Sequence, residues 1–246
     1  MSARVSIASR RGSDREPGVS RGAGRWSLAA ALILAAIAGC SKQVQTGPPL
    51  ADPEIVATRV REATGPPGPF RLRFDWQYAD EHGQLSGEGV ARYNPTDSLR
   101  LDLFAPGDAS MGVSLTPSGL TTLGQIEEVR LPGPVFLYAM AGIFRPGGTP
   151  PGRGFLADSS QVLVFPVGSD SLFAHLQGFR VLRLEERRSG RVRKRIEVSW
   201  DGLGVWPRSA EYRDFVESRR VRWELTEATE VLTKHAAEIY DLPHRM

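Results

Sequence analysis

The chain has 246 residues, of which 41% are hydrophobic, and it carries 31 lysines and arginines against 28 aspartates and glutamates. Six of these arginines and only two of the acidic residues lie within residues 1–39, so the remainder is nearly neutral and gives no indication of nucleic-acid binding. Cys40 is the single cysteine, which excludes an internal disulfide and a cysteine-rich metal site.

The first segment, residues 1–39, has the layout of an export signal. An arginine-rich stretch precedes an uncharged apolar run from Trp26 to Ala38, and the chain becomes polar directly after Cys40. A membrane-spanning helix needs about 20 apolar residues, and this run is shorter. The segment therefore predicts export and not a membrane span.

The residues Ile37-Ala38-Gly39-Cys40 resemble the lipobox of bacterial lipoprotein precursors. The resemblance implies that residues 1–39 are removed as a signal peptide and that Cys40 becomes the N-terminus and carries a diacylglycerol. The protein is then anchored to an envelope membrane through that lipid, and Ser41 at the next position favours the outer membrane, on its periplasmic side. The alternative is a buried core helix in which Cys40 is merely a small hydrophobic residue.

Residues 40–51 are polar, contain a proline pair and show no periodicity, which predicts a flexible tether from the lipidated cysteine. A single domain is expected over residues 52–246. It begins with a short helix, because Asp52 is a good N-cap, Pro53 suits the first helical position and Glu54 suits the first turn. The helix is predicted to end near Ala63, before the sequence TGPPGP.

From Phe70 the hydrophobic period changes to two. Apolar and polar residues alternate in FRLRFDWQY, which is typical of a half-buried strand. The stretches LSGEGVARY, SLRLDLFA and MGVSLTPSGLTTLG continue the pattern and are separated by turn residues. This half of the domain is predicted to be a meander of antiparallel strands.

Residues 132–148 differ from the rest because no charge occurs before Arg145. Pro134 at the start and Gly147-Gly148 at the end favour a helix, Val135 to Phe144, over a strand. A helix that is apolar on all sides is buried or lies against an apolar ligand. Because the loop that follows is rich in proline and glycine, we predict that this helix is a movable lid.

After this loop the strands resume, in QVLVFPV, FRVLRLEERR, RVRKRIEVSW, GVWPRSAEYRDF and ESRRVRWELTEATEV. Their alternation makes one sheet face apolar and leaves the other in water, as in antiparallel sheets. The predicted fold class is mainly β (α+β), with about nine to eleven antiparallel strands. They form a strongly curved sheet, an unclosed barrel, with the apolar helix in its concavity and a short N-terminal helix.

This pattern resembles the LolA/LolB-like domains of outer-membrane lipoprotein carriers and receptors, over roughly Asp52 to Pro243. The resemblance rests on the helix before FRLRFDWQY, on the central VFLYAMAGIF, and on the closing GVWPRSAEYRDF, RRVRWELTEAT and AAEIYDLP. It implies an unclosed barrel covered by short helices, with lipid or lipoprotein acyl chains as the cargo.

The candidate ligand-binding residues are the large apolar side chains that are predicted to face the concavity. They line either a cavity for acyl chains or an ordinary filled core, and composition does not separate the two. They are Phe74, Trp76, Leu101, Leu103, Leu137, Met140, Phe144, Trp200, Trp223 and Leu225.

A second candidate surface is the basic turn RRSGRVRKR. Its residues Arg191, Arg193 and Arg195 are placed to contact anionic lipid headgroups, which attract clustered basic residues. The alternative is a solvated turn whose charges discourage pairing at a sheet edge.

No catalytic signature accompanies these residues. The histidines, His82, His175, His235 and His244, lack spaced partners for a metal, and neither a G-x-S-x-G nor a GK[ST] motif occurs. We therefore expect no enzyme, no metal and no cofactor. Two functions remain: a carrier or receptor for lipid or lipoprotein in the envelope, and a structural lipoprotein that holds protein partners around a filled core.

Overall fold

The computed structural model describes residues 47–95, 97–124, 126, 129–202 and 204–242. The chain divides into the units Met1–Gln43 and Val44–Met246, and every described residue belongs to the second. The predicted signal peptide, Cys40, residues 40–46 of the predicted tether and His244 lie outside the described residues. No helix in the described ranges is long and apolar enough to cross a membrane.

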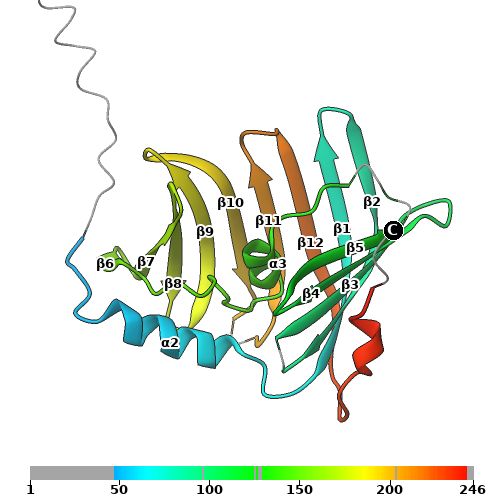
Figure 1. The fold of residues 1–246 in the computed structure, drawn as a ribbon, viewed down its shortest axis with the longest axis horizontal. Coiled ribbons are helices and arrows are strands. Elements are labelled where there is room, and N and C mark those ends of the chain that lie inside the picture. Colours follow the sequence, from blue (N-terminus) through cyan, green and yellow to red (C-terminus); the bar gives the residue numbers. More distant parts are fainter. Residues whose placement is uncertain (1–46, 96, 125, 127–128, 203, 243–246) are drawn as a thin grey trace, which may run out of the picture. The chain divides into compact units, whose positions relative to one another are not determined.

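Antiparallel strands form one sheet of twelve strands (Figure 1). They follow the chain as two meanders, and pairing of β1 with β12 joins them. The sheet ends at β5 on one side and at β6 on the other, so it does not close into a barrel. The strands are β1 (Phe70–Asp80), β2 (Gly83–Asn94), β3 (Ser98–Phe104), β4 (Ser110–Thr116), β5 (Gly119–Gly124), β6 (Arg153–Ala157), β7 (Ser160–Val167), β8 (Asp170–Gln177), β9 (Arg180–Arg188), β10 (Arg191–Trp200), β11 (Pro207–Asp214) and β12 (Arg219–Glu230).

The alternation predicted for the strands is confirmed in the sheet. On β1 every second residue from Phe70 to Tyr78 is buried, and the residues between them are exposed. The buried side chains belong to one hydrophobic core on the concave face. The expected range of nine to eleven strands is too low, because the sequence analysis does not predict β6 and β8.

Helix α2 (Pro53–Thr64) crosses one end of the sheet (Figure 1). Its N-terminus is capped as predicted, because the Asp52 carboxylate accepts a hydrogen bond of 3.0 Å from the backbone N–H of Ile55. Ala57 and Val60 are buried in the main core. The helix extends one residue beyond the predicted end.

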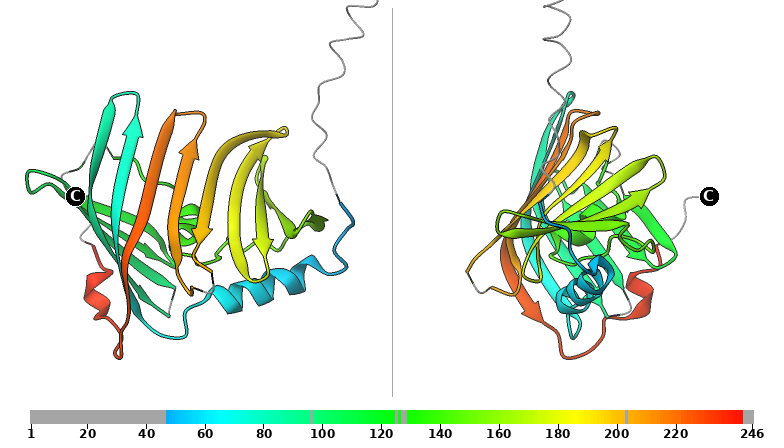
Figure 2. Two further views of the ribbon diagram at one scale, coloured as in Figure 1. Left: turned by 180° about the vertical axis from the view of Figure 1, so that it is seen from behind. Right: turned by 90° about the vertical axis from the view of Figure 1, so that its left-hand side faces the viewer.

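Helix α3 (Pro134–Met140) lies on the concave side of the sheet (Figure 2). It is shorter than the predicted helix Val135–Phe144, because Gly142 adopts a φ of +80°, a left-handed conformation that does not continue a helix. The backbone N–H of Gly142 donates to the carbonyl of Ala139 at 2.9 Å. Phe144 lies beyond the helix and is nevertheless fully buried.

Part of the predicted tether is ordered against the sheet. Pro49 forms a bridge with Phe155 of β6, and the backbone N–H of Leu50 bonds to the carbonyl of Gly154 at 3.0 Å. The backbone N–H of Leu156 bonds to the carbonyl of Pro48 at 2.9 Å. These residues cover the β6 edge, which would otherwise present unpaired backbone groups.

The C-terminal segment packs on the outer side of β2 to β4 and contains the 3₁₀-helix η1 (Ala237–Ile239). The Ser114 hydroxyl donates to the carbonyl of Tyr240 at 2.5 Å, and the side-chain amide of Asn94 pairs with the backbone of His235 in both directions. These contacts hold the end of the described chain against the sheet.

Candidate functional site

The structure brings the ten predicted cavity residues into one continuous hydrophobic cluster. Eight of them are fully buried, while Trp200 and Leu225 are partly buried and pack against the same core. Leu137 and Met140 come from α3, Phe144 comes from the segment after it, and the others come from β1, β3, β10 and β12.

The concavity holds little free space. A cavity of about 10 Å³ lies between Phe74, Met140, Trp223 and Leu225, and Leu72, Pro207, Arg208, Ser209 and Ala210 complete its wall. This is about the space that one water molecule requires, whereas ligand sites usually measure several hundred Å³. The concavity is therefore filled by α3 and by the aromatic side chains of the sheet.

Helix α3 is held on the sheet by apolar contacts and by one polar anchor. The Phe136 ring meets the edge of the Tyr212 ring, with 5.2 Å between the centroids. The Tyr138 hydroxyl donates to the carbonyl of Asp97 at 2.6 Å. Burial and the nearby Asp97 charge raise the pKa of Tyr138, so this hydroxyl stays protonated and remains a donor.

The segment after α3 is fixed by a polar cluster that we call the latch, consisting of Thr64, Asp97 and Arg145. The Arg145 guanidinium donates twice to Oδ1 of Asp97, at 2.8 and 2.9 Å, and once to the carbonyl of Arg61. The Thr64 hydroxyl accepts a hydrogen bond of 3.0 Å from the backbone N–H of Phe144. The latch connects α2, the β2–β3 turn and the end of the α3 segment.

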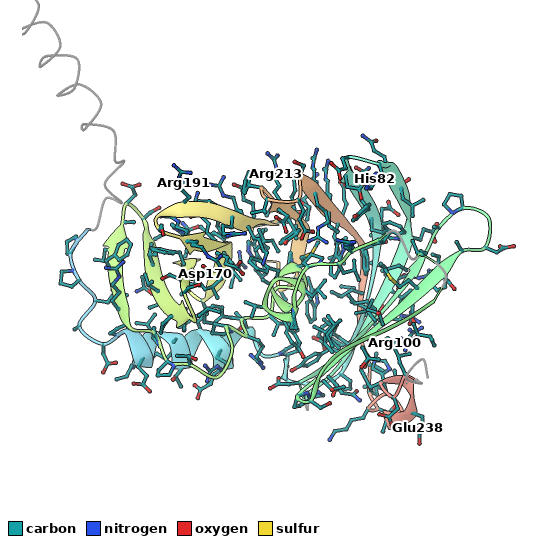
Figure 3. All side chains as sticks on the ribbon, turned by 45° about the horizontal axis from the view of Figure 1, so that its top comes forward. His82, Arg100, Asp170, Arg191, Arg213 and Glu238 are labelled. Atoms are coloured by element: carbon teal, nitrogen blue, oxygen red, sulfur yellow. The ribbon has the colours of Figure 1, made fainter. Side chains whose placement is uncertain are left out.

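A larger cavity, of about 880 Å³, lies at the other end of the sheet, between the β1–β2 and β11–β12 turns. Its wall combines apolar residues, Leu85, Val129 and Val216, with the charged Asp80, Glu81, Arg130, Glu217 and Arg219. It is therefore more polar than the mostly apolar sites that hold small ligands. His82, predicted to lie in a turn, is at this rim (Figure 3). No sequence pattern predicts this cavity, because its residues come from turns that are far apart in the chain.

The outer face of β9 carries a buried carboxylate, Glu185, which is 1% exposed. Its oxygens accept hydrogen bonds from Arg187 and, at 2.9 Å, from Arg195, and Arg183 lies 3.6 Å away. Burial acts to raise the pKa of Glu185, but the hydrogen bond from Arg187 and the neighbouring arginine charges hold it below its usual value.

His175 lies beside this cluster, and burial followed by the charge of Arg183 lowers its pKa to about 4. Its Nδ1 faces a guanidinium nitrogen of Arg183 at 3.2 Å, so Nδ1 accepts and the proton resides on Nε2. The histidine is therefore neutral near pH 7.

Most cations of the basic turn are paired. Arg195 contacts Glu185 and Glu197, Lys194 bonds to Glu186 at 2.9 Å, and Arg188 bonds to Asp170. Within the described part of the chain, Arg191 and Arg193 form no ion pair. Of the three predicted headgroup residues, these two form no ion pair with a described carboxylate. Figure 3 shows Arg191 at the turn between β9 and β10.

Within the described ranges no group of three or more His, Cys, Asp or Glu residues is arranged to hold a metal ion. His235 forms hydrogen bonds to residues far away in the chain: Nε2 lies 3.1 Å from the carbonyl of Phe70, and the backbone pairs with the side chain of Asn94. His82 is exposed in its turn.

No protein-family model matches the chain, and no curated protein matches it. Among solved structures, a DUF1329 family protein from Desulfovibrio piger superposes with a TM-score of 0.52 at 9% identity, over 78% of this chain and 98% of that one. This likeness and the open antiparallel half-barrel with a helix in its concavity agree with the architecture implied by the sequence resemblance. The fold is LolA/LolB-like.

Two further solved structures are similar. A LolA superfamily protein from Nitrosomonas europaea has 16% identity and a TM-score of 0.49, over 76% of this chain and 97% of that one. A putative outer membrane lipoprotein-sorting protein domain from Vibrio parahaemolyticus has 8% identity and a TM-score of 0.48, over 75% and 94%.

Proposed function

We propose that the protein is a membrane-anchored lipoprotein facing the periplasm that binds lipid or lipoprotein acyl chains in its concavity, for transport within the envelope. The observation that carries the proposal is α3. This helix of seven residues is buried from Phe136 to Met140, and the segment that follows it, residues 141–152, belongs to no strand. Such a helix can leave the concavity without breaking a sheet hydrogen bond.

Binding then requires that an acyl chain replace α3 in the concavity. When α3 withdraws, the inward side chains of β9, β10 and β11 lose their apolar cover. An acyl chain restores that cover, and each of its CH₂ groups contributes about 0.8 kcal/mol on burial. The latch opposes the withdrawal, so the fraction of protein with an open concavity depends on Asp97 and Arg145.

We expect the chain from residue 41 onward to bind a hydrophobic fluorescent probe saturably, and to bind it several-fold more tightly after Arg145→Ala. Loss of the Arg145 contacts raises the open fraction, and the apparent affinity rises in proportion to that fraction. Fluorescence titration at constant salt measures both affinities.

Arg153→Ala is the matched control, because Arg153 is an exposed arginine of β6 and forms no ion pair within the described residues. It should leave the probe affinity unchanged. The proposal would be contradicted if neither the wild-type protein nor the Arg145→Ala variant bound the probe saturably.

The second candidate function is a structural lipoprotein whose filled core supports protein partners. The small cavity beside Met140 favours it, because a rigid filled barrel needs no internal space. Mass spectrometry of the purified protein separates the two functions: stoichiometric lipid that co-purifies supports the carrier, and repeated recovery of an empty protein supports the scaffold.

The anchor is proposed to be the lipid on Cys40. We expect Cys40→Ser to abolish incorporation of labelled palmitate and to prevent processing to the mature protein, because the serine hydroxyl cannot form the thioether. Ser41→Ala should leave the labelling intact. The measurements are metabolic labelling and the mass of the product; an unlabelled wild-type protein, or labelling that persists in the Cys40 variant, would rule out this anchor.

A further inference from the structure

Trp76 and Trp223 are opposite each other on the paired strands β1 and β12. Both are buried, with 1% and 4% of their surface exposed. Nε1 of Trp76 donates to the carbonyl of Glu88 at 2.9 Å, and Nε1 of Trp200 donates to the carbonyl of Val181 at 2.9 Å. Nε1 of Trp223 is also buried but has no hydrogen-bond partner among the described residues.

A buried indole N–H normally has an acceptor, and leaving it unpaired costs free energy. The aromatic neighbour does not satisfy it. The Phe74 ring stacks on Trp223 with an interplanar angle of 18° and centroids 4.3 Å apart, so it covers the face of the indole and not the edge that carries the N–H. Trp223 thus keeps an unused donor in an otherwise apolar environment.

Trp223 belongs to the lining of the small cavity, and Met140 of α3 belongs to it as well. Withdrawal of α3 therefore enlarges the space beside Trp223. Arg208 is the charged residue in the wall of this cavity, and its side chain is 63% exposed. The cavity thus has a polar, solvent-facing side at Arg208 and Ser209, where Arg208 lies 3.5 Å from Asp201, and its remaining walls are apolar. This arrangement suits a ligand with a polar end and an apolar chain.

We propose that Trp223 recognises the acyl carbonyl of the bound lipid, its Nε1–H donating to the carbonyl oxygen. This inference rests on the proposed function and narrows its ligand class to chains attached through a carbonyl. An ester-linked chain supplies both the apolar surface that the concavity takes and the acceptor that Trp223 lacks. An ether-linked alkyl chain supplies the apolar surface but lacks the carbonyl oxygen, and its ether oxygen is a weaker acceptor. A site built around a hydrogen bond to a carbonyl therefore binds such an analogue less tightly.

The test compares a diacyl phosphatidylglycerol with its dialkyl-ether analogue of equal chain length, as competitors of the fluorescent probe on full-length protein. We expect the ester lipid to bind about five-fold more tightly, the effect of one net hydrogen bond. Trp223→Phe should bind both lipids equally and keep the affinity for the ether lipid. Trp76→Phe is the matched comparison. Because Trp76 also lies in the apolar cluster, this substitution changes the affinity for both lipids alike, and the ester preference should remain because the Trp76 N–H is already paired within the sheet.

A second measurement uses the unsubstituted protein. The indole ¹H–¹⁵N signal of Trp223, assigned by its loss in Trp223→Phe, should move downfield with the ester lipid and not with the ether lipid. Equal affinity of the wild-type protein for both lipids, or an ester preference that survives Trp223→Phe, overturns this inference and leaves acyl-chain binding in place. Failure of both lipids to displace the probe overturns the proposed function as well.

Discussion

Replacing Glu185 with alanine is expected to lower the free energy of unfolding by about 3 kcal/mol, the lower end of the cost of breaking a buried ion pair. Glu185 is 1% exposed and is the shared acceptor of Arg187 and Arg195, with Arg183 close by. Without it, three guanidinium groups repel one another on the outer face of the sheet. Urea unfolding followed by circular dichroism measures the loss.

Glu224→Ala is the control for this prediction. Glu224 is also an outward-facing carboxylate beside an arginine, but its side chain is 51% exposed and Arg222 lies 3.4 Å away. Such exposed pairs contribute about 0.2–1 kcal/mol, so the control should change stability little. Equal effects of the two substitutions would show that burial of Glu185 contributes nothing.

The dependence on pH distinguishes Glu185 from its neighbour His175. The folded pKa of Glu185 lies below its usual value of 4.5, so its stabilisation is present above that pH and is lost as the pH falls further. His175 has a folded pKa of about 4 against 6.5, so the unfolded chain takes up its proton first and stability decreases as the pH falls from 6.5 to about 4. Glu185→Ala should remove the loss of stability below pH 4.5 that Glu185 causes, and it should keep the decrease between pH 6.5 and about 4 that His175 causes.

The alternation of apolar and polar residues predicts most of the sheet because most strands have one buried face and one wet face. Strand β8 has two buried faces. Leu172 and Ala174 belong to the main core, whereas Phe173 packs in a separate cluster with Phe155, Val162 and Val164. Its sequence therefore lacks the period of two on which the prediction depends. Strand β6 is short and directly follows a proline- and glycine-rich loop, so its signal is weaker still.

The candidate site was only partly predictable for a related reason. Large inward-facing side chains such as Phe74 and Trp223 are identified by periodicity, but whether they enclose space depends on packing. The latch joins Asp97 to Arg145, which are 48 positions apart. The N–H of Trp223 is unpaired because no described neighbour places a hydrogen-bond acceptor beside it. Neither feature leaves a local pattern in the sequence, and both bear on how α3 and the ligand compete.

Placing a charge on α3 should distinguish a lid from a core helix. Leu137 on α3 and Leu101 on β3 are both 0% exposed. Leu101→Asp buries an unpaired carboxylate in a strand paired on both sides, and we expect it to cost more than about 4 kcal/mol or to prevent folding. If α3 is a lid, Leu137→Asp moves the helix into water and the sheet stays folded.

The expected result is that Leu137→Asp loses at least about 2 kcal/mol less than Leu101→Asp, since its carboxylate is hydrated instead of buried. The variant should also bind the hydrophobic probe more tightly than the wild-type protein, because its concavity is permanently open. Urea unfolding and fluorescence titration on the same samples measure the two effects. If Leu137→Asp is as destabilising as Leu101→Asp and binds no probe, α3 is an integral part of the core, and the filled scaffold becomes the better account of the fold.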